Sequence, residues 1–345
     1  MSTTRRTPTI QDVARFAQVS TATVSRALSS PERVSQDTRL RISEAVLATG
    51  YTLNQAARSL RQRTSKTILV ALPDIRNIFF SAILDAIERE ATRRGYSTLV
   101  CNRCSGPNPA RQLGEYFRSH RADGLLLLDG ALNLSHLLEL AGEPTDVPLV
   151  VACEDIPDAP FHTVKTDNAR AAASATQHLI NLGHTRIGHI AGPLGNVLRD
   201  ERLEGFRQAI HDAGLYVRPD WIFPGNFQME SGFAAGLDYL AGTDRPTAMF
   251  AANDEMAIGF LSALREKGLE CPRDISVVGF DDLAVAVHYS PPLTTIRQPR
   301  EKLGQMAAQM LIGLLEGRAV EPRRVVLRSE LILRSSTARF HSPPG

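Results

Sequence analysis

The 345-residue sequence lacks three features that define whole classes of protein. It has no apolar run approaching the roughly 20 residues needed to span a bilayer, so we expect no membrane partner. Its four cysteines are too few for a disulfide framework. Its first residues are basic, but the apolar segment of a secretory signal does not follow them. These absences predict a protein of the reducing cytoplasm.

The common catalytic signatures are also missing. No GxxxxGK[ST], GxGxxG, GxSxG or HExxH motif occurs, so phosphate-loop, dinucleotide, hydrolase and zincin chemistries lack support. Cys101 and Cys104 form a CxxC pair, but a zinc site needs four ligands and the sequence has no second pair. His184 and His189 are better explained as packing or surface residues than as a catalytic base. We therefore expect no enzyme, no metal and no cofactor.

The small net charge of +2 hides two opposed halves. Residues 1–66 carry 11 Lys/Arg against 4 Asp/Glu, a net charge of +7, whereas residues 67–345 carry 28 against 33, a net charge of −5. A basic head on a larger, mildly acidic body indicates that the head binds a polyanion. At about 100–200 residues per domain, the length predicts two or three domains.

The head has the pattern of a helix-turn-helix. Thr9 is a predicted N-cap of a first helix, and Ser20 is the predicted cap of a second, which follows after a short turn. A third helix is expected from Ser35 to Gly50, where glycine supplies a left-handed end. The residues expected to close the small core are Val13, Ala14, Val19, Val24, Leu40, Ile42, Val46 and Leu47.

The second helix presents short side chains and one arginine outward, namely Thr21, Ala22, Thr23, Ser25 and Arg26. Short side chains permit close approach to base edges, and an arginine can pair with guanine O6 and N7. Further arginines would contact phosphates without reading sequence, namely Arg39, Arg41, Arg61 and Arg63. The spacing alone fits a generic three-helix domain with a solvated face equally well, and the +7 charge favours nucleic acid.

The segment after the head has a short helical pattern. Asn54 can cap a helix of about eight residues, which is marginal in water unless it docks on something. A charged linker is the alternative.

The body alternates short apolar runs with amphipathic stretches. Strands are predicted at 68–72, 97–101, 124–128, 148–152, 186–191, 248–252 and 276–280, and helices at 80–94, 109–120, 169–182, 200–213, 230–241, 255–267 and 300–316. This alternation predicts parallel sheets covered by helices on both faces. Ligands bind outside the C-terminal ends of such strands. Candidate contacts there are Asp74, Asn102, Asp129, Asn253, Asp254, Asp281 and Asp282.

The whole chain resembles the LacI/GalR family of bacterial transcription repressors, and most closely its nucleoside-responsive members. Residues 12–60 resemble the family's DNA-binding headpiece and hinge helix, with the sequence DVARFAQVSTATVSRALSSPERVSQDTRLRISEAVLATGYTLNQAARSL. The body continues the resemblance through GHTRIGHIAGP (183–193), ANDEMAIG (252–259), ISVVGFDD (275–282) and PPLTTIRQP (291–299).

The resemblance implies a small all-α helix-turn-helix headpiece at 1–52, a hinge helix and linker at 53–65, and an α/β periplasmic-binding-protein-like core at 66–345. The core would have two doubly wound parallel-sheet lobes, lobe 1 at about 67–165 and 298–327, and lobe 2 at about 166–297 and 328–345. The family's base-reading positions fall on Thr21, Ala22 and Arg26, and its minor-groove wedge on Leu60. The implied DNA contacts are Thr9, Ser20, Thr21, Ala22, Thr23, Ser25, Arg26, Asn54, Ala57, Arg58 and Leu60.

The resemblance also implies an effector cleft between the lobes, on Phe79, Phe80, Asp167, Asn196, Leu198, Arg202, Phe227, Asn253 and Asp281. Carboxylates, amides and arginine suit hydroxyl groups, and phenylalanine offers a flat face to a ring. For each polar residue, a structural cap or an ion pair within one lobe is the alternative. Purine-reading members carry Arg and Thr where this chain has Asn196 and Leu198, which argues against a purine base and leaves a nucleoside or a sugar.

The resemblance implies a cytoplasmic, nucleoid-associated repressor that binds a pseudopalindromic operator as a homodimer. The dimer face is expected on the helices near 80–94 and 109–120 and on the region 252–290. The short, proline-rich end TARFHSPPG favours a dimer over a tetramer. Release from DNA by the effector is expected by analogy. The rival interpretation is a small-molecule-binding protein in which the body alone carries the function.

Overall fold

A computed structural model of the protein describes residues 8–51, 64–102, 109–130, 137, 148–156 and 159–340. The chain divides into two compact units, Met1–Arg63 and Thr64–Gly345, which we describe separately. Within the described ranges, no helix is long and apolar enough to cross a membrane. The predictions made for Asn54, Ala57, Arg58, Leu60 and Cys104 concern residues outside these ranges, as do those for Arg61 and Arg63.

The first unit is a three-helix domain with α1 (Ile10–Phe16), α2 (Thr21–Ser29), the 3-10 turn η1 (Pro31–Arg33) and α3 (Gln36–Thr49). The predicted caps Ser20 and Ser35 are confirmed. Each hydroxyl accepts a hydrogen bond from the backbone N–H of the third residue of its helix, Thr23 in α2 and Thr38 in α3. Gly50 ends α3 in the left-handed region, as predicted, at φ +64°. At Thr9 the roles differ: its N–H and hydroxyl both donate to the Asp12 carboxylate.

The core of this unit is smaller than the sequence predicts. Its buried residues are Val13, Ala14, Ala17, Val24, Ile42 and Ala45. The prediction for Leu40 and Leu47 is wrong, since they are 59% and 83% exposed. Ile42 and Ala45 lie on the inward face of α3, and the helical period of 3.6 turns Leu40 and Leu47 to the opposite side.

The second unit contains two six-stranded sheets. Lobe 1 has the order β11-β5-β4-β3-β1-β2, with all pairs parallel. Its strands are β1 (Thr67–Leu72), β2 (Ser97–Asn102), β3 (Gly124–Leu127), β4 (Leu149–Cys153), β5 (His162–Thr166) and β11 (Arg324–Leu327). Lobe 2 has the order β12-β10-β9-β8-β6-β7, in which only β12 is antiparallel among the described pairs. Its strands are β6 (Ile187–Ile190), β7 (Ile222–Phe223), β8 (Ala248–Ala251), β9 (Ser276–Asp281), β10 (Thr294–Arg297) and β12 (Glu330–Ile332).

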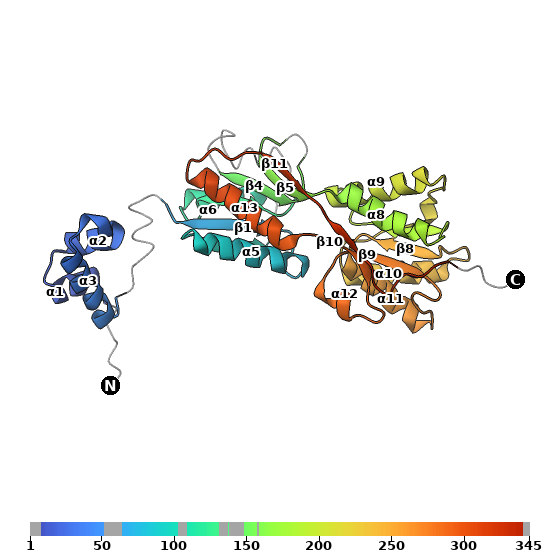
Figure 1. The fold of residues 1–345 in the computed structure, drawn as a ribbon, viewed down its shortest axis with the longest axis horizontal. Helices are drawn as coiled ribbons and strands as arrows, with labels where there is room; N and C mark the ends of the chain where they lie inside the picture. The colour runs from blue at the N-terminus through green and yellow to red at the C-terminus, as the bar shows by residue number, and fades with distance from the viewer. Residues whose placement is uncertain are drawn as a thin grey trace. The chain divides into compact units, whose positions relative to one another are not determined.

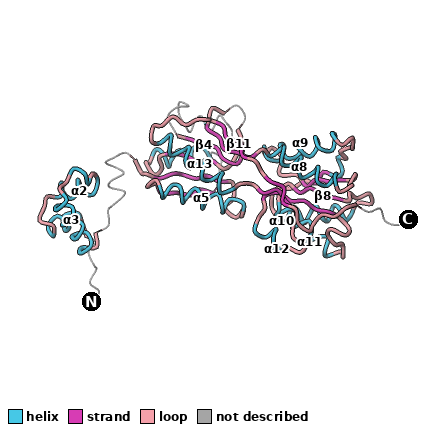
Figure 2. The backbone as a smooth tube through the Cα atoms, in the orientation of Figure 1, coloured by secondary structure: helices cyan, strands magenta, loops and turns pink. Residues whose placement is uncertain are grey.

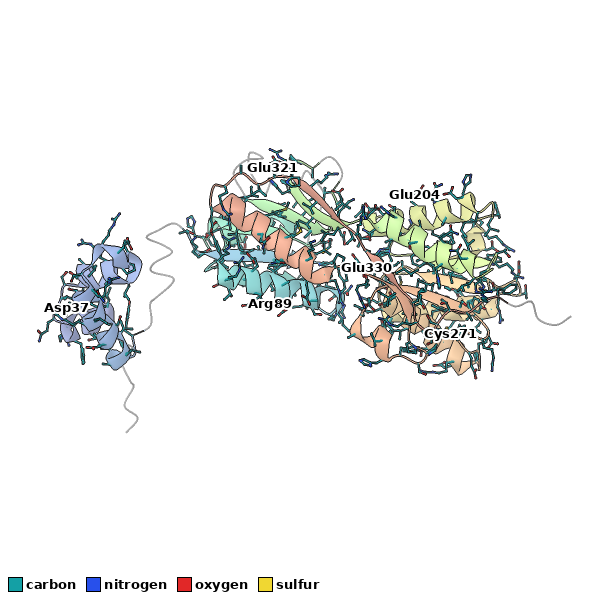
Figure 3. All side chains as sticks on the ribbon, viewed as in Figure 1. Asp37, Arg89, Glu204, Cys271, Glu321 and Glu330 are labelled. Carbon is teal, nitrogen blue, oxygen red and sulfur yellow. The ribbon has the colours of Figure 1, made fainter. Side chains whose placement is uncertain are left out.

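Helices cover both faces of each sheet (Figures 1 and 2). In lobe 1, α5 (Phe79–Arg93) and α13 (Arg300–Leu315) pack on one face and α6 (Pro109–Arg118) on the other. In lobe 2, α8 (Asn168–Asn181) and α9 (Val197–Asp212) cover one face, and α10 (Met229–Ala241) and α11 (Asp254–Glu266) the other. A short α12 (Ala284–His288) follows β9. Exposed charges lie on the outer faces, as with Arg89 on α5 and Glu204 on α9 (Figure 3).

All seven predicted strands and all seven predicted helices of the body are present. Five strands were not predicted, namely β5, β7, β10, β11 and β12. Except for the two-residue β7, they lie where the chain passes between lobes: after β5, after β10 and after β11. These strands are only two to five residues long, and pairing with distant segments creates them, as when β11 pairs with β5.

Candidate functional site

The first candidate surface is the outer face of α2 in the headpiece. Thr21, Ala22 and Arg26 are exposed, while Val24 on the other side of the helix is buried in the core. The hydroxyls of Ser20 and Thr23 lie 2.9 Å apart and hold each other at the start of the helix. The amino end of α2 is therefore a polar surface, and the exposed Arg26 lies in the last turn of the same helix.

Arg41, one of the predicted phosphate contacts, forms hydrogen bonds within the headpiece. The Arg41 guanidinium donates to the carbonyl oxygens of Ala17 and Gln18, so it holds the turn between α1 and α2. Gln18 lies in the left-handed region at φ +53°, which closes that turn. Arg41 therefore has a structural role in this turn, and its phosphate contact stays a prediction.

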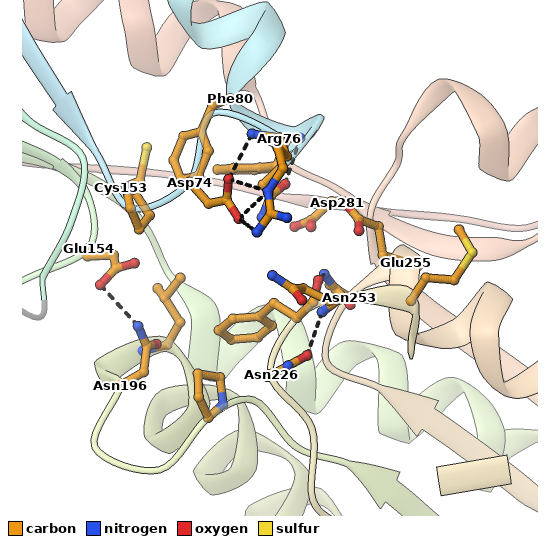
Figure 4. Close-up of a pocket in the computed structure, with 18 of the residues that line it drawn as sticks. Asp74, Arg76, Phe80, Cys153, Glu154, Asn196, Asn226, Asn253, Glu255 and Asp281 are labelled. Atoms are coloured by element: carbon orange, nitrogen blue, oxygen red, sulfur yellow. Dashed lines mark hydrogen bonds and ion pairs between the residues drawn. The ribbon is translucent and has the colours of Figure 1, made fainter. Parts of the chain in front are cut away.

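The second candidate site is a cavity of about 560 Å³ between the lobes (Figure 4). This volume lies within the range of about 300–1,000 Å³ that is typical of small-molecule sites. Lobe 1 contributes Pro73, Asp74, Arg76, Asn77, Phe79, Phe80, Cys153 and Glu154, and lobe 2 contributes Pro193, Asn196, Leu198, Arg202, Asn226, Phe227, Gln228, Met229, Glu230, Asn253, Glu255 and Asp281. Most of these residues follow the carboxyl ends of β1, β4, β6, β7, β8 and β9, where ligands bind in sheets of this kind.

Eight of the nine residues expected at the cleft line this cavity, and Asp167 does not. The Asp167 carboxylate instead accepts the Arg170 N–H at 3.1 Å and caps α8. Of the strand-end residues proposed as contacts, Asp74, Asn253 and Asp281 line the cavity. Asn102 accepts the Ile75 N–H and serves the loop instead.

A buried charged pair is part of the cavity lining. Arg202 is 3% exposed and its guanidinium lies 3.9 Å from the Asp281 carboxylate. It also donates to Asn168 at 3.1 Å and to the Ala252 carbonyl at 2.5 Å. Burial raises the pKa of Asp281 to about 6, and Arg202 and Gln298 oppose this rise. The pair is therefore held by several contacts, and both residues line the cavity.

This pair is connected to the points where the chain changes lobes. Gln298, just after β10, donates to Asp281 at 2.7 Å and accepts the Thr166 hydroxyl at 2.8 Å at the end of β5. Arg202 holds Asn168, the first residue of α8. A shift of Arg202 or Asp281 would therefore act directly on two of the three segments in which the chain passes between the lobes, the one after β5 and the one after β10.

Three acidic residues of the cavity were missed by the sequence analysis, namely Glu154, Glu230 and Glu255. Glu154 follows β4 and its Oε2 accepts the Gly130 N–H at 2.8 Å and the Asn196 amide of the other lobe at 3.3 Å. Burial raises its pKa to about 7, and the Asp129 carboxylate adds to the rise. Burial likewise raises the pKa of Glu255 to about 7, with further increases from Asp281 and Glu230. The strand-end rule that selected Asp74 and Asp281 also applies to Glu154.

Three residues that line the cavity have backbones in the left-handed region, where only glycine is free of strain. They are Cys153 at φ +73°, Phe227 at φ +67° and Asp281 at φ +114°. Each such position costs on the order of 1–3 kcal/mol and persists only where the surrounding structure enforces it. Their clustering around one cavity supports a functional site there.

His184 and His189 are buried packing residues, in agreement with the prediction. His189 is fully buried and stacks between Phe206 and Phe250, with ring centroids 5.1 and 4.9 Å away. Burial lowers its pKa to about 3, so it stays neutral. His184 is buried and bonded to Thr247 and Ser276. Among the described residues, no group of His, Cys, Asp and Glu could hold a metal ion.

Comparison with known proteins extends over both units. Residues 9–54 match the family described as bacterial regulatory proteins, lacI family, and residues 176–337 match the periplasmic binding protein-like domain. The HTH-type transcriptional repressor CytR of Escherichia coli (strain K12) is 39% identical over 330 residues, 95% of this chain and 96% of the relative.

Two solved structures have the same architecture. The crystal structure of the Lac repressor dimer bound to operator and the anti-inducer ONPF has a TM-score of 0.86 at 31% identity, and covers 96% of this chain and 100% of that chain. The complex of the transcriptional regulator CelR with cellobiose has a TM-score of 0.72 at 33% identity, and covers 95% and 99%.

Proposed function

The chain belongs to the lacI family of bacterial regulatory proteins, and we propose that it is a transcriptional repressor whose operator affinity is set by a small ligand between its lobes. The observation that carries this proposal is the coincidence of an exposed α2 reading face with a buried, strained ligand cavity in one chain. A protein whose body alone carries the function has no use for the headpiece.

We assign operator contacts to the exposed face of α2. Arg26 is the residue suited to a bidentate contact with guanine, and Thr21 and Ala22 suit thymine methyl groups. The proposed contact set extends to Thr9, Ser20, Thr23 and Ser25, and to Asn54, Ala57, Arg58 and Leu60 in the hinge. The relatives named above include a dimer on its operator, and we propose a homodimer on a pseudopalindromic site for this chain too.

The proposed domain plan is a headpiece at 1–52, a hinge at 53–65 and a core at 66–345. A protein that acts on chromosomal DNA works in the cytoplasm, bound to the nucleoid. We propose regulation without catalysis, in keeping with relatives that are repressors.

The ligand response is proposed to start at Arg202 and Asp281. A ligand that contacts them moves the groups that hold Gln298 and Asn168, and so changes the angle between the lobes. A ligand can shift this equilibrium only by its differential affinity for the two states. A coupling of about 1–3 kcal/mol changes operator affinity roughly 5- to 150-fold. We propose induction, in which the ligand weakens operator binding.

Two variants test the proposal as a pair. An operator is first selected from random duplex DNA with the full-length protein, and binding is then measured by fluorescence anisotropy. Arg26→Ala should weaken operator binding by about 1–3 kcal/mol, relax base preference at one position and keep ligand binding. Asp281→Asn should keep operator binding and lose the ligand response. Equal binding of the wild-type protein to operator and random DNA would contradict a sequence-specific repressor.

A further inference from the structure

The chain enters lobe 1 through residues 64–66, and all three are bonded to one carboxylate. Thr64 is the first residue of the second unit, and Asp123 lies directly before β3. The Thr64 hydroxyl and the Lys66 N–H donate to Asp123 Oδ2 at 2.6 and 2.7 Å. The Ser65 N–H and hydroxyl donate to Oδ1 at 2.8 and 2.9 Å. We call these four hydrogen bonds the entry clamp.

The entry clamp holds both backbone and side chains. Two successive backbone N–H groups directed at one anion form the kind of concave site that binds anions. Hydrogen bonds to an ionised acceptor are roughly twice as strong as those between neutral groups. Lys66 lies in the left-handed region at φ +51°, a conformation that persists in a lysine only where its surroundings enforce it. Its Nζ also donates to the Tyr96 hydroxyl at 3.1 Å and lies 4.3 Å from the centroid of that ring.

The first strand of lobe 1 does not depend on the Asp123 side chain. Strand β1 is paired with β2 along its whole length and with β3 over four residues. Its first residue, Thr67, is held by the Asp123 backbone, whose N–H donates to the Thr67 carbonyl at 2.9 Å. The carboxylate therefore acts on the segment before the strand, which is the continuation of the chain that leaves the first unit at Arg63.

We propose that Asp123 is a positioning residue for operator binding, because its carboxylate fixes the point at which the hinge enters lobe 1. The inference rests on the proposed function, since it takes Leu60 as the last hinge contact with DNA and the protein as a homodimer on two half-sites. Its consequence is that the two hinges of a dimer start from defined points on their cores.

The lengths of chain involved give the size of the effect. With the entry clamp formed, three residues (61–63) separate Leu60 from the first fixed residue, Thr64. Without it, the first fixed residue is Thr67 and the connection doubles to six residues. The effective concentration of the second hinge at its half-site falls with about the 3/2 power of the length of a flexible connection. Loss of the clamp should therefore weaken binding to a complete operator at least about threefold.

A pair of DNA duplexes tests this on the full-length protein. One duplex carries the complete operator selected from random DNA and the other carries a single half-site, and binding is followed by fluorescence anisotropy. Asp123→Ala should weaken binding to the complete operator at least about threefold, and should change half-site binding by less than about 1.5-fold, because a single half-site engages only one hinge. The control Asp238→Ala, at an exposed acid on α10, should change neither.

Variants of the donors reach the same contact without altering lobe 1 at Asp123. The double variant Thr64→Val with Ser65→Ala removes two of the four donors and should weaken operator binding in the same direction. Added to Asp123→Ala, it should have no further effect, because partners in one network are not additive. If Asp123→Ala does not fold, as judged by thermal unfolding, this donor variant decides the question by itself.

Trypsin cleavage after Lys66 reports on the entry clamp directly. Cleavage needs local opening of the chain, so it should be at least about fivefold faster in Asp123→Ala than in the wild-type protein. Faster cleavage with an unchanged ratio of operator to half-site affinity would make Asp123 a local folding contact and overturn the inference, and so would an unchanged cleavage rate. The proposed function fails separately, if the wild-type protein shows no preference for operator over random DNA.

Discussion

The buried carboxyl group of Glu154 is expected to make the folding stability of the protein depend on pH. Its side chain is almost completely buried, and its pKa is raised from the ordinary 4.5 to about 7. Between pH 4.5 and about pH 7, the Glu154 carboxyl keeps its proton in the folded protein and has lost it in the unfolded chain. Stability conferred by this group is therefore present below about pH 4.5 and is lost as pH rises to about 7.

The expected magnitude follows from the size of the shift. A rise of roughly 2.5 pKa units corresponds to about 3 kcal/mol, as an upper bound, since each unit is about 1.4 kcal/mol. Glutamine has the same shape and stays neutral, and its oxygen can still accept the Gly130 N–H. Glu154→Gln should thus leave stability nearly unchanged at pH 4.5 and raise it by up to about 3 kcal/mol at pH 8.

Urea unfolding of the ligand-free protein at the two pH values measures this difference. Circular dichroism follows both lobes, and the fluorescence of Trp221, the single tryptophan of the sequence, follows lobe 2. Glu204→Gln serves as the control and should show no pH-dependent gain. A variant whose stability differs from wild type by the same amount at pH 4.5 and pH 8 would refute the assigned burial of a charge at Glu154.

Three further predictions concern packing and the contacts between lobes. Gln298→Leu removes two buried hydrogen bonds and should destabilise the protein by about 2–4 kcal/mol in urea unfolding. The control Gln177→Leu, on the exposed side of α8, should cost less than about 0.5 kcal/mol in the same assay. Gly205→Ala would place a Cβ 2.0 Å from the Ala169 carbonyl oxygen, so its melting temperature should drop despite a gain of about 1 kcal/mol in helix propensity; an unchanged melting temperature would contradict the close packing of α8 on α9. In the headpiece, Ile42→Ala should cost about 2–4 kcal/mol and Leu47→Ala less than about 0.5 kcal/mol by thermal unfolding, and equal losses would mean that Leu47 packs inward after all.

The sequence predicted those parts of the fold that depend on local patterns. Buried strands such as β1 and β9 are continuous apolar runs, and helices such as α5 and α11 show one apolar stripe, so both are visible within a short window. Strands β5, β10 and β11 are not, because each is four or five residues long and owes its existence to a partner far away in the chain. The prediction that Leu40 and Leu47 are buried is wrong for a different reason. Both are apolar, but their positions along α3 place them on its outward face.

The candidate site was predictable where residue type and strand end coincide, as for Asn253 and Asp281. Asp167 shows the limit of this rule, because a carboxylate just before a helix satisfies the helix end as well as it would a ligand, and here it caps α8. Only the observed hydrogen bond distinguishes the two roles.

The acid excess of the cavity could not be predicted by any local rule, because it is a property of two lobes together. Glu154 and Glu255 are far apart in sequence, and each alone resembles an ordinary surface acid. Both lining arginines lie beside acids of the same cavity, Arg76 beside Asp74 and Arg202 beside Asp281. The Glu154 carboxyl is buried, with a pKa raised to about 7, directly after the strained backbone of Cys153. Which acids are buried in the cavity therefore follows from the two folded lobes together and not from any single segment of the sequence.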